Sequence, residues 1–296
     1  MEYYIDEITL PEYFILPGEF DWKLIDQELG FSEIFEIIPK EIYLQLKEET
    51  EDNKKEIFRL LTKASVLYSF ILAIPKIKVH ITNYGVQEFI QEKSKSAPWW
   101  DVRDLGLSLL KFADKLFSEA LTKIAGIEAL KNSIPFFENV SENIKTPAEF
   151  EEIYSIKNSP KVFKMLQTYL VQAYSLDVLD KIKPDCIEQI KLKPELYKFL
   201  KQANICYALY YASLMPNFVF LQNAIVIQYE ELPWQKSQVL TPDAKINSGK
   251  NFVKLGDASM KVITDFIKKN LSEFPCYSEP VPESKPQSRT SGIYMI

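Results

Sequence analysis

The sequence predicts a mainly α-helical chain with small β-hairpins, an α+β class built as a tandem duplication of one helical-bundle-plus-hairpin unit. Three observations support this prediction. Apolar residues recur at helical spacing over most of the chain, two short segments alternate apolar and polar residues around a turn, and the order of these segments is the same in both halves. The hydrophobic fraction of 47% indicates a chain that folds around a core.

The first unit begins with short helices on either side of Pro39 and continues in a long helix, Asp52 to Ile74, which Pro75 is expected to end. Residues 77–90 then alternate around an Asn-Tyr-Gly turn, as in a hairpin. An amphipathic helix over 99–126 closes the unit. Its predicted apolar face consists of Val102, Leu105, Leu109, Phe112, Leu116, Leu121 and Ile124.

The second unit repeats this order. Pro184 corresponds to Pro39, a long helix runs from Pro194 to Met215, a hairpin follows over 218–229, and a helix over 251–271 closes the unit. The predicted apolar face of that helix consists of Leu255, Val262, Ile263, Phe266 and Ile267. The pairs Leu105-Gly106 and Leu255-Gly256 occupy matching places in the two closing helices. We interpret the pattern as a duplication; a chance match of two helix-hairpin-helix patterns is the alternative.

The chain therefore divides into four predicted parts: an N-terminal arm (1–22), a first unit (23–145), a second unit (146–272) and an extended tail rich in Pro and Ser (273–296). The arm is aromatic and interrupted by prolines, which suits extended chain packed on its own core or on a neighbour. The tail ends in an apolar tip on a polar tether, either a hook for a partner or a frayed end.

The net charge, the cysteines and the apolar runs limit which classes of function fit the chain. A net charge of −6 argues against tight wrapping of nucleic acid but is compatible with a channel through which DNA slides. The three cysteines have no paired spacing and follow no secretory leader, so we expect a reducing compartment. The longest apolar run, near Ala64 to Pro75, is too short and too interrupted for a membrane span, so no membrane partner is expected.

No motif in the sequence carries recognisable chemistry. His80 is the only histidine and lies in a predicted strand, so a nucleophile–histidine arrangement is not indicated. Metal-binding spacings and glycine-rich phosphate loops are missing, and we expect no catalytic residues, no metal and no cofactor. The Trp99-Trp100 pair is either core packing at a helix start or an exposed anchor. The candidate subunit-interface residues are Tyr3, Tyr4, Trp22, Trp99, Trp100, Ile293, Tyr294, Met295 and Ile296.

The doubled pattern, the PWWDVRDL run within a helix-hairpin-helix stretch, and the phrase FEEIYSIKNSPKVFKML at residues 150–166 resemble a family from Bacteroidales phages and prophages. Members of that family look like head-to-tail connector proteins, including ring proteins in the tail barrel of crAss-like tailed bacteriophages. The likeness covers most of residues 21–271 and is a pattern of positions, without a catalytic signature.

The resemblance implies a structural virion protein, made in the host cytoplasm and located at the head–tail interface or in the tail. It implies a homo-oligomer, a dodecameric ring below the portal protein that contacts other ring or tail proteins. DNA would pass through its lumen without sequence-specific binding. Two alternatives stay open: a cytoplasmic helical adaptor or regulatory binding module outside virions, and an enzyme of unusual chemistry with converging carboxylates.

Overall fold

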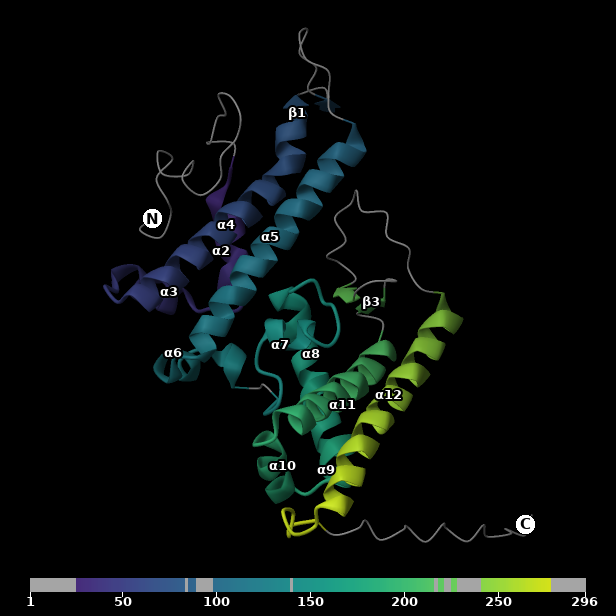
Figure 1. Cartoon of the computed structure of the whole chain (residues 1–296). Helices are drawn as coiled ribbons and strands as arrows, with labels where there is room; N and C mark the ends of the chain where they lie inside the picture. The colour runs from purple at the N-terminus through teal and green to yellow at the C-terminus, as the bar shows by residue number, and fades with distance from the viewer. Residues whose placement is uncertain are drawn as a thin grey trace, which may run out of the picture.

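The structure is a computed structural model that describes residues 25–82, 85–88, 98–138, 141–215, 218–220, 225–227 and 241–277. Two pairs of long helices organise the fold, α4 with α5 and α11 with α12, and shorter helices pack against each pair (Figure 1). The elements are α2 (Gln27–Phe35), α3 (Lys40–Glu48), α4 (Asp52–Lys78), β1 (Val79–Thr82), β2 (Gly85–Glu88), α5 (Trp99–Ala125), α6 (Glu128–Asn132), η2 (Pro135–Phe137), α7 (Pro147–Glu151), α8 (Pro160–Ala173), η3 (Tyr174–Val178), α9 (Leu179–Lys181), α10 (Pro184–Lys191), α11 (Pro194–Ser213), β3 (Phe218–Phe220), β4 (Ile225–Ile227) and α12 (Pro242–Lys269).

In the first half of the chain, α2 packs across α4, and α4 lies along α5. Asp26 starts α2 by accepting a hydrogen bond from the Glu28 backbone N–H at 3.2 Å. Gly30 permits the close approach of α2 to α4, because a Cβ atom there would lie 2.0 Å from the backbone oxygen of Ser65. The two helices therefore meet backbone to backbone at this point.

In the second half, α8 and α12 both pack against α11. Ser159 and Thr241 cap the first turns of α8 and α12 with their side-chain oxygens. The chain passes from α8 into a single π-helical turn, η3, before the short helix α9. This half follows the same order of elements as the first: short helices, a long helix, a short strand pair and a closing long helix.

The predicted α+β class is wrong, and the fold is all-α. About 78% of the described residues are helical, and the core residues whose burial is described lie in helices or in the connections between them. At the two predicted hairpins, β1 pairs with β2 over four residues and β3 with β4 over three. Isolated two-stranded pairs of this length form no layer on which helices could pack, so they do not define the class.

Two predicted helix limits also change. Pro75 does not end the long helix, because α4 continues to Lys78 with Pro75 in its last turn. A proline near a helix end removes one N–H donor but leaves the earlier turns intact. The closing helix α12 begins at Pro242, well before the predicted start at 251, since its first turns carry polar residues that weaken the apolar pattern.

Helix α4 contains a stretch, Asp52–Pro75, that is long and apolar enough to cross a membrane by length and composition, since an apolar 18-residue window within it has a mean hydropathy of 1.7. The core helix of a packed domain meets the same criterion, and 78% of the apolar window in α4 is buried inside the protein. In the sequence this run looked shorter, near Ala64 to Pro75, because Ser65 and Ser69, both buried in the structure, interrupt it.

Two of the three cysteines form a disulfide, which their spacing in the sequence did not indicate. Cys186 of α10 and Cys276, which follows α12, form a disulfide with their Cα atoms 5.6 Å apart. The third cysteine, Cys206, is free and buried in α11, and burial raises the pKa of its thiol to about 11. The disulfide fastens the end of the second half to α10.

Candidate functional site

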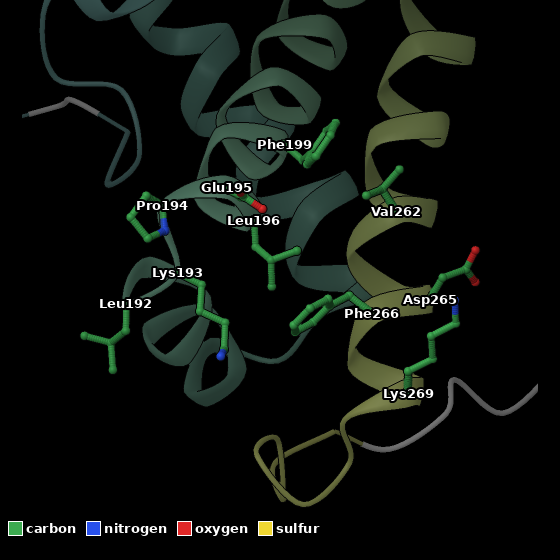
Figure 2. Close-up of a pocket in the computed structure, with 10 residues that line it drawn as sticks. All are labelled: Leu192, Lys193, Pro194, Glu195, Leu196, Phe199, Val262, Asp265, Phe266 and Lys269. Carbon is green, nitrogen blue, oxygen red and sulfur yellow. The ribbon is translucent and has the colours of Figure 1, made fainter.

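A groove of about 830 Å³ lies between α12 and the turn that joins α10 to α11. Figure 2 shows the side chains that line it, with Phe266 pointing from α12 toward α11. We call this cavity the groove. Its lining is Leu192, Lys193, Pro194, Glu195, Leu196, Phe199, Val262, Asp265, Phe266 and Lys269.

Local sequence shapes each wall of the groove separately. Pro194 occupies the first turn of α11, and the preceding turn leaves Leu192 82% exposed at the rim. On α12, helical spacing places Val262, Phe266 and Lys269 along the opposite wall. Buried Leu196 lies between these walls, so the groove combines an apolar interior with charged edges.

Charged side chains lie at one end of the groove. Lys193 forms an ion pair with Glu273 at 2.6 Å, and its ammonium lies 5.6 Å from the centre of the Phe266 ring. Both partners of the ion pair are partly exposed, so the pair contributes little to stability and mainly orients Lys193. The groove therefore has apolar side chains inside a charged rim, as protein-contact surfaces do.

A polar cluster joins α9, α11 and α12, and its member on α12 precedes the groove-lining residues of that helix. The ammonium of Lys181 donates to the Tyr207 hydroxyl and to Asp257, both at 2.7 Å, and Tyr207 donates to Asp257 at 2.8 Å. Burial would raise the pKa of Asp257, but the hydrogen bonds from Lys181 and Tyr207 outweigh it and lower that pKa. A Cβ atom on Gly256 would lie 2.7 Å from the Tyr207 ring, so this glycine admits the ring to the cluster.

The π-helical turn adds a second tyrosine–carboxylate contact to this region. Tyr211 donates to Asp177 of η3 at 2.9 Å. Burial raises the pKa of Asp177, and burial together with the Asp177 contact raises the pKa of Tyr211 to about 12. The first half has a related pair, because Tyr68 of α4 donates to buried Asp114 of α5 at 2.5 Å. These contacts hold helices together, and each tyrosine hydroxyl in them is hydrogen-bonded to a carboxylate.

A further cavity of about 550 Å³ lies where the first half meets α8, with Phe35, Pro135, Phe136 and Val171 among its lining residues. Lys164 of α8 donates to the Glu36 carbonyl oxygen at 2.7 Å on its wall. In the part of the chain that the structure describes, no group of three or more His, Cys, Asp or Glu side chains is placed to hold a metal ion.

Two helices carry exposed apolar side chains at regular spacing. Leu105 and Phe112 of α5 are 46% and 42% exposed, and Leu255 and Val262 of α12 are 50% and 42% exposed. All four belong to the apolar faces predicted for these helices, so part of each predicted face is exposed. An apolar stripe wider than the packed contact leaves its edge in solvent, and periodicity cannot show which edge that is.

Most of the predicted interface residues belong to the two ends of the chain. Tyr3, Tyr4, Trp22 and residues 293–296 lie outside the described residues, and for Trp99 only the backbone, at the start of α5, is described. Trp100 is described, and its side chain is 50% exposed. His80 lies in β1 with its side chain outside the description.

Sequence reasoning missed the groove and the exposed positions on α5 and α12. One signal was present: Leu105 and Phe112 are seven residues apart, and Leu255 and Val262 occupy the positions 150 residues later. The groove itself had no such signal, because it depends on how the α10–α11 turn lies against α12.

Comparison with known proteins yields one family. A model of a family of unknown function (DUF6712) matches residues 25–122, a stretch that begins just before α2 and ends within the last turn of α5. It covers less than half of the chain. No curated protein and no solved structure matches the chain.

Proposed function

We propose that this protein is a structural virion protein, a head-to-tail connector subunit that assembles as a ring below the portal and forms part of the DNA conduit. The observation that carries the proposal is the pair of exposed, regularly spaced apolar faces on α5 and α12, one on each helical unit. Exposed apolar positions repeated on two long helices suit contact between proteins. The groove beside α12 extends that contact surface.

Two further features support the proposal. The resemblance to connector and tail-barrel ring proteins of crAss-like phages supplies the expected assembly, a dodecameric ring that contacts the portal and other tail proteins. The net charge of −6 fits a conduit through which DNA moves, since an acidic surface gains little from releasing the counterions of phosphate.

A second candidate is a cytoplasmic helical adaptor or regulatory binding module. The groove favours it, because a cavity of about 830 Å³ with Phe199 and Phe266 in its lining suits an apolar helix or peptide of a partner. Both candidates act through contacts with other proteins. What distinguishes them is location, in virions for the connector and in the cytoplasm for the adaptor.

Quantitative mass spectrometry of purified virions from the phage that encodes the chain tests the proposal. We expect this protein at the same copy number as the portal protein, or at a ratio that a symmetric ring on the portal allows. Its absence from virions that contain the portal protein would contradict the connector role and favour the adaptor.

A further inference from the structure

The exposed residues of α5 form a continuous heptad seam. Leu105, Ser108, Phe112, Lys115 and Glu119 are all exposed, and they follow one another at alternating intervals of three and four residues. This spacing places them along one line of the helix, as in the contact seam of a coiled coil. We call these five residues the α5 face.

Helix α12 carries the same seam 150 residues later. Leu255, Ala258, Val262, Asp265 and Lys269 are all exposed, and three of them also line the groove. We call these five residues the α12 face. Position by position, the two faces pair Leu105 with Leu255, Ser108 with Ala258, Phe112 with Val262, Lys115 with Asp265 and Glu119 with Lys269.

The charges of the two faces are opposite at matching positions. Lys115 matches Asp265, and Glu119 matches Lys269. Within the described residues, the four charged members of the two faces have no ion-pair partner, so their charges are available to another chain. The apolar positions match as well, so the two faces are complementary along their length.

The same charges disfavour pairing of like faces. Two α5 faces packed in parallel would oppose Lys115 to its own copy and Glu119 to its own copy, and two α12 faces would do the same with Asp265 and Lys269. Antiparallel packing of two α5 faces about Phe112 would place Leu105 against Glu119. Among these pairings, that of an α5 face with an α12 face in parallel matches apolar to apolar and positive to negative.

We infer that α5 of one copy packs parallel and in register on α12 of the next copy, with Phe112 entering the mouth of the groove beside Val262. Such a contact joins two different surfaces, so it is heterologous and propagates head to tail. A heterologous contact closes into a ring when its rotation divides a full turn. The inference deepens the proposed function, on which it rests for the ring, by naming the surfaces that neighbouring subunits share.

Cysteine cross-linking of the full-length chain tests this contact. The double variant F112C/V262C, under mild oxidation, should give a ladder of covalent oligomers, because each copy then offers one thiol to each neighbour. Either single variant alone should stay at the level of the wild-type chain, and a mixture of the two single variants should give dimers only. The matched control is K111C/K261C, which is exposed on the same helices about 100° around from Phe112 and Val262 and should give no ladder.

A second pair, L105C/L255C, guards against a local disturbance at Phe112 and should give the same ladder. Dimers from F112C alone would overturn the inference in favour of an α5–α5 contact. The absence of a ladder from both double variants, with unchanged circular dichroism, would overturn the inference outright. If no ladder forms but the protein is present in virions at the copy number of the portal protein, the α5–α12 contact is contradicted and the connector role is not. If a ladder forms but the protein is absent from virions, the connector role is contradicted and the contact is not.

Discussion

The first and second helical units differ around the matching positions Phe112 and Val262 of their closing helices. In the first unit, Phe112 lies on α5 with the ammonium of Lys63 over its ring at 5.3 Å, and Lys123 bridges to Glu56 at 3.1 Å. In the second unit, the smaller Val262 occupies the matching position, and the groove opens beside it. The first unit therefore presents a partly exposed phenylalanine where the second presents a smaller side chain beside a groove, and the inferred head-to-tail contact uses this difference.

The two units also differ in how closely their helices approach. Gly30 of the first unit faces the Ser65 backbone at a distance that no Cβ atom tolerates, whereas Gly256 of the second faces only the Tyr207 side chain. We expect Gly30→Ala to lower the free energy of unfolding by about 3 kcal/mol or more and Gly256→Ala by about 1–3 kcal/mol, because a ring yields more easily than backbone. Urea denaturation measures both, and equal losses would contradict the difference in packing.

The disulfide is the next largest difference, since the described part of the first unit contains no disulfide. Cys276→Ser should lower the free energy of unfolding by about 2–4 kcal/mol, because the bridge between Cys186 and Cys276 closes a long loop in the unfolded chain. The loss should appear in hydrogen exchange at α10 and α12, with α4 and α5 less affected. A reductant should destabilise the wild-type chain and leave the variant unchanged; an equal effect on both would contradict the role of this bridge.

We expect ionisation of Tyr211 to lower the free energy of unfolding at alkaline pH. The pKa of Tyr211 is raised from 10.0 to about 12 in the folded chain, so the stabilisation from its neutral form is complete below pH 10 and is lost as pH rises to about 12. Tyr211→Phe removes this contribution. Its free energy of unfolding, followed by urea denaturation from below pH 10 to pH 12, should fall less steeply than that of the wild type; parallel curves would exclude this role for Tyr211.

The smallest effects on folding are expected at the two faces. Leu105→Ser and Leu255→Ser should each change the free energy of unfolding by less than about 0.5 kcal/mol, because both side chains are already about half exposed. The same substitutions should lower the cross-linking yield of the F112C/V262C chain. A large loss of stability with unchanged cross-linking would place these leucines in the fold and remove them from the contact.

Periodicity predicted the long helices well, because each buries a stripe at helical spacing, as the positions of Leu109, Ala113 and Phe117 in α5 illustrate. It led to the wrong fold class, because the two strand pairs at the predicted hairpins are too short to form a layer of the fold. It could not distinguish buried Leu109 from exposed Leu105, since both belong to one apolar stripe. The disulfide between Cys186 and Cys276 joins residues 90 apart in the sequence, and the groove depends on a turn that meets another helix, so neither could be predicted from local pattern.

The most direct test of the account is a charge swap between the two faces, read as the rate of cross-linking in the F112C/V262C chain. Lys115→Glu alone and Asp265→Lys alone should each slow the reaction, because each places like charges opposite one another. The two substitutions together should restore the rate, and Lys111→Glu, exposed on α5 outside the face, should leave it unchanged. A double variant that reacts more slowly than either single variant would contradict the head-to-tail contact of α5 with α12.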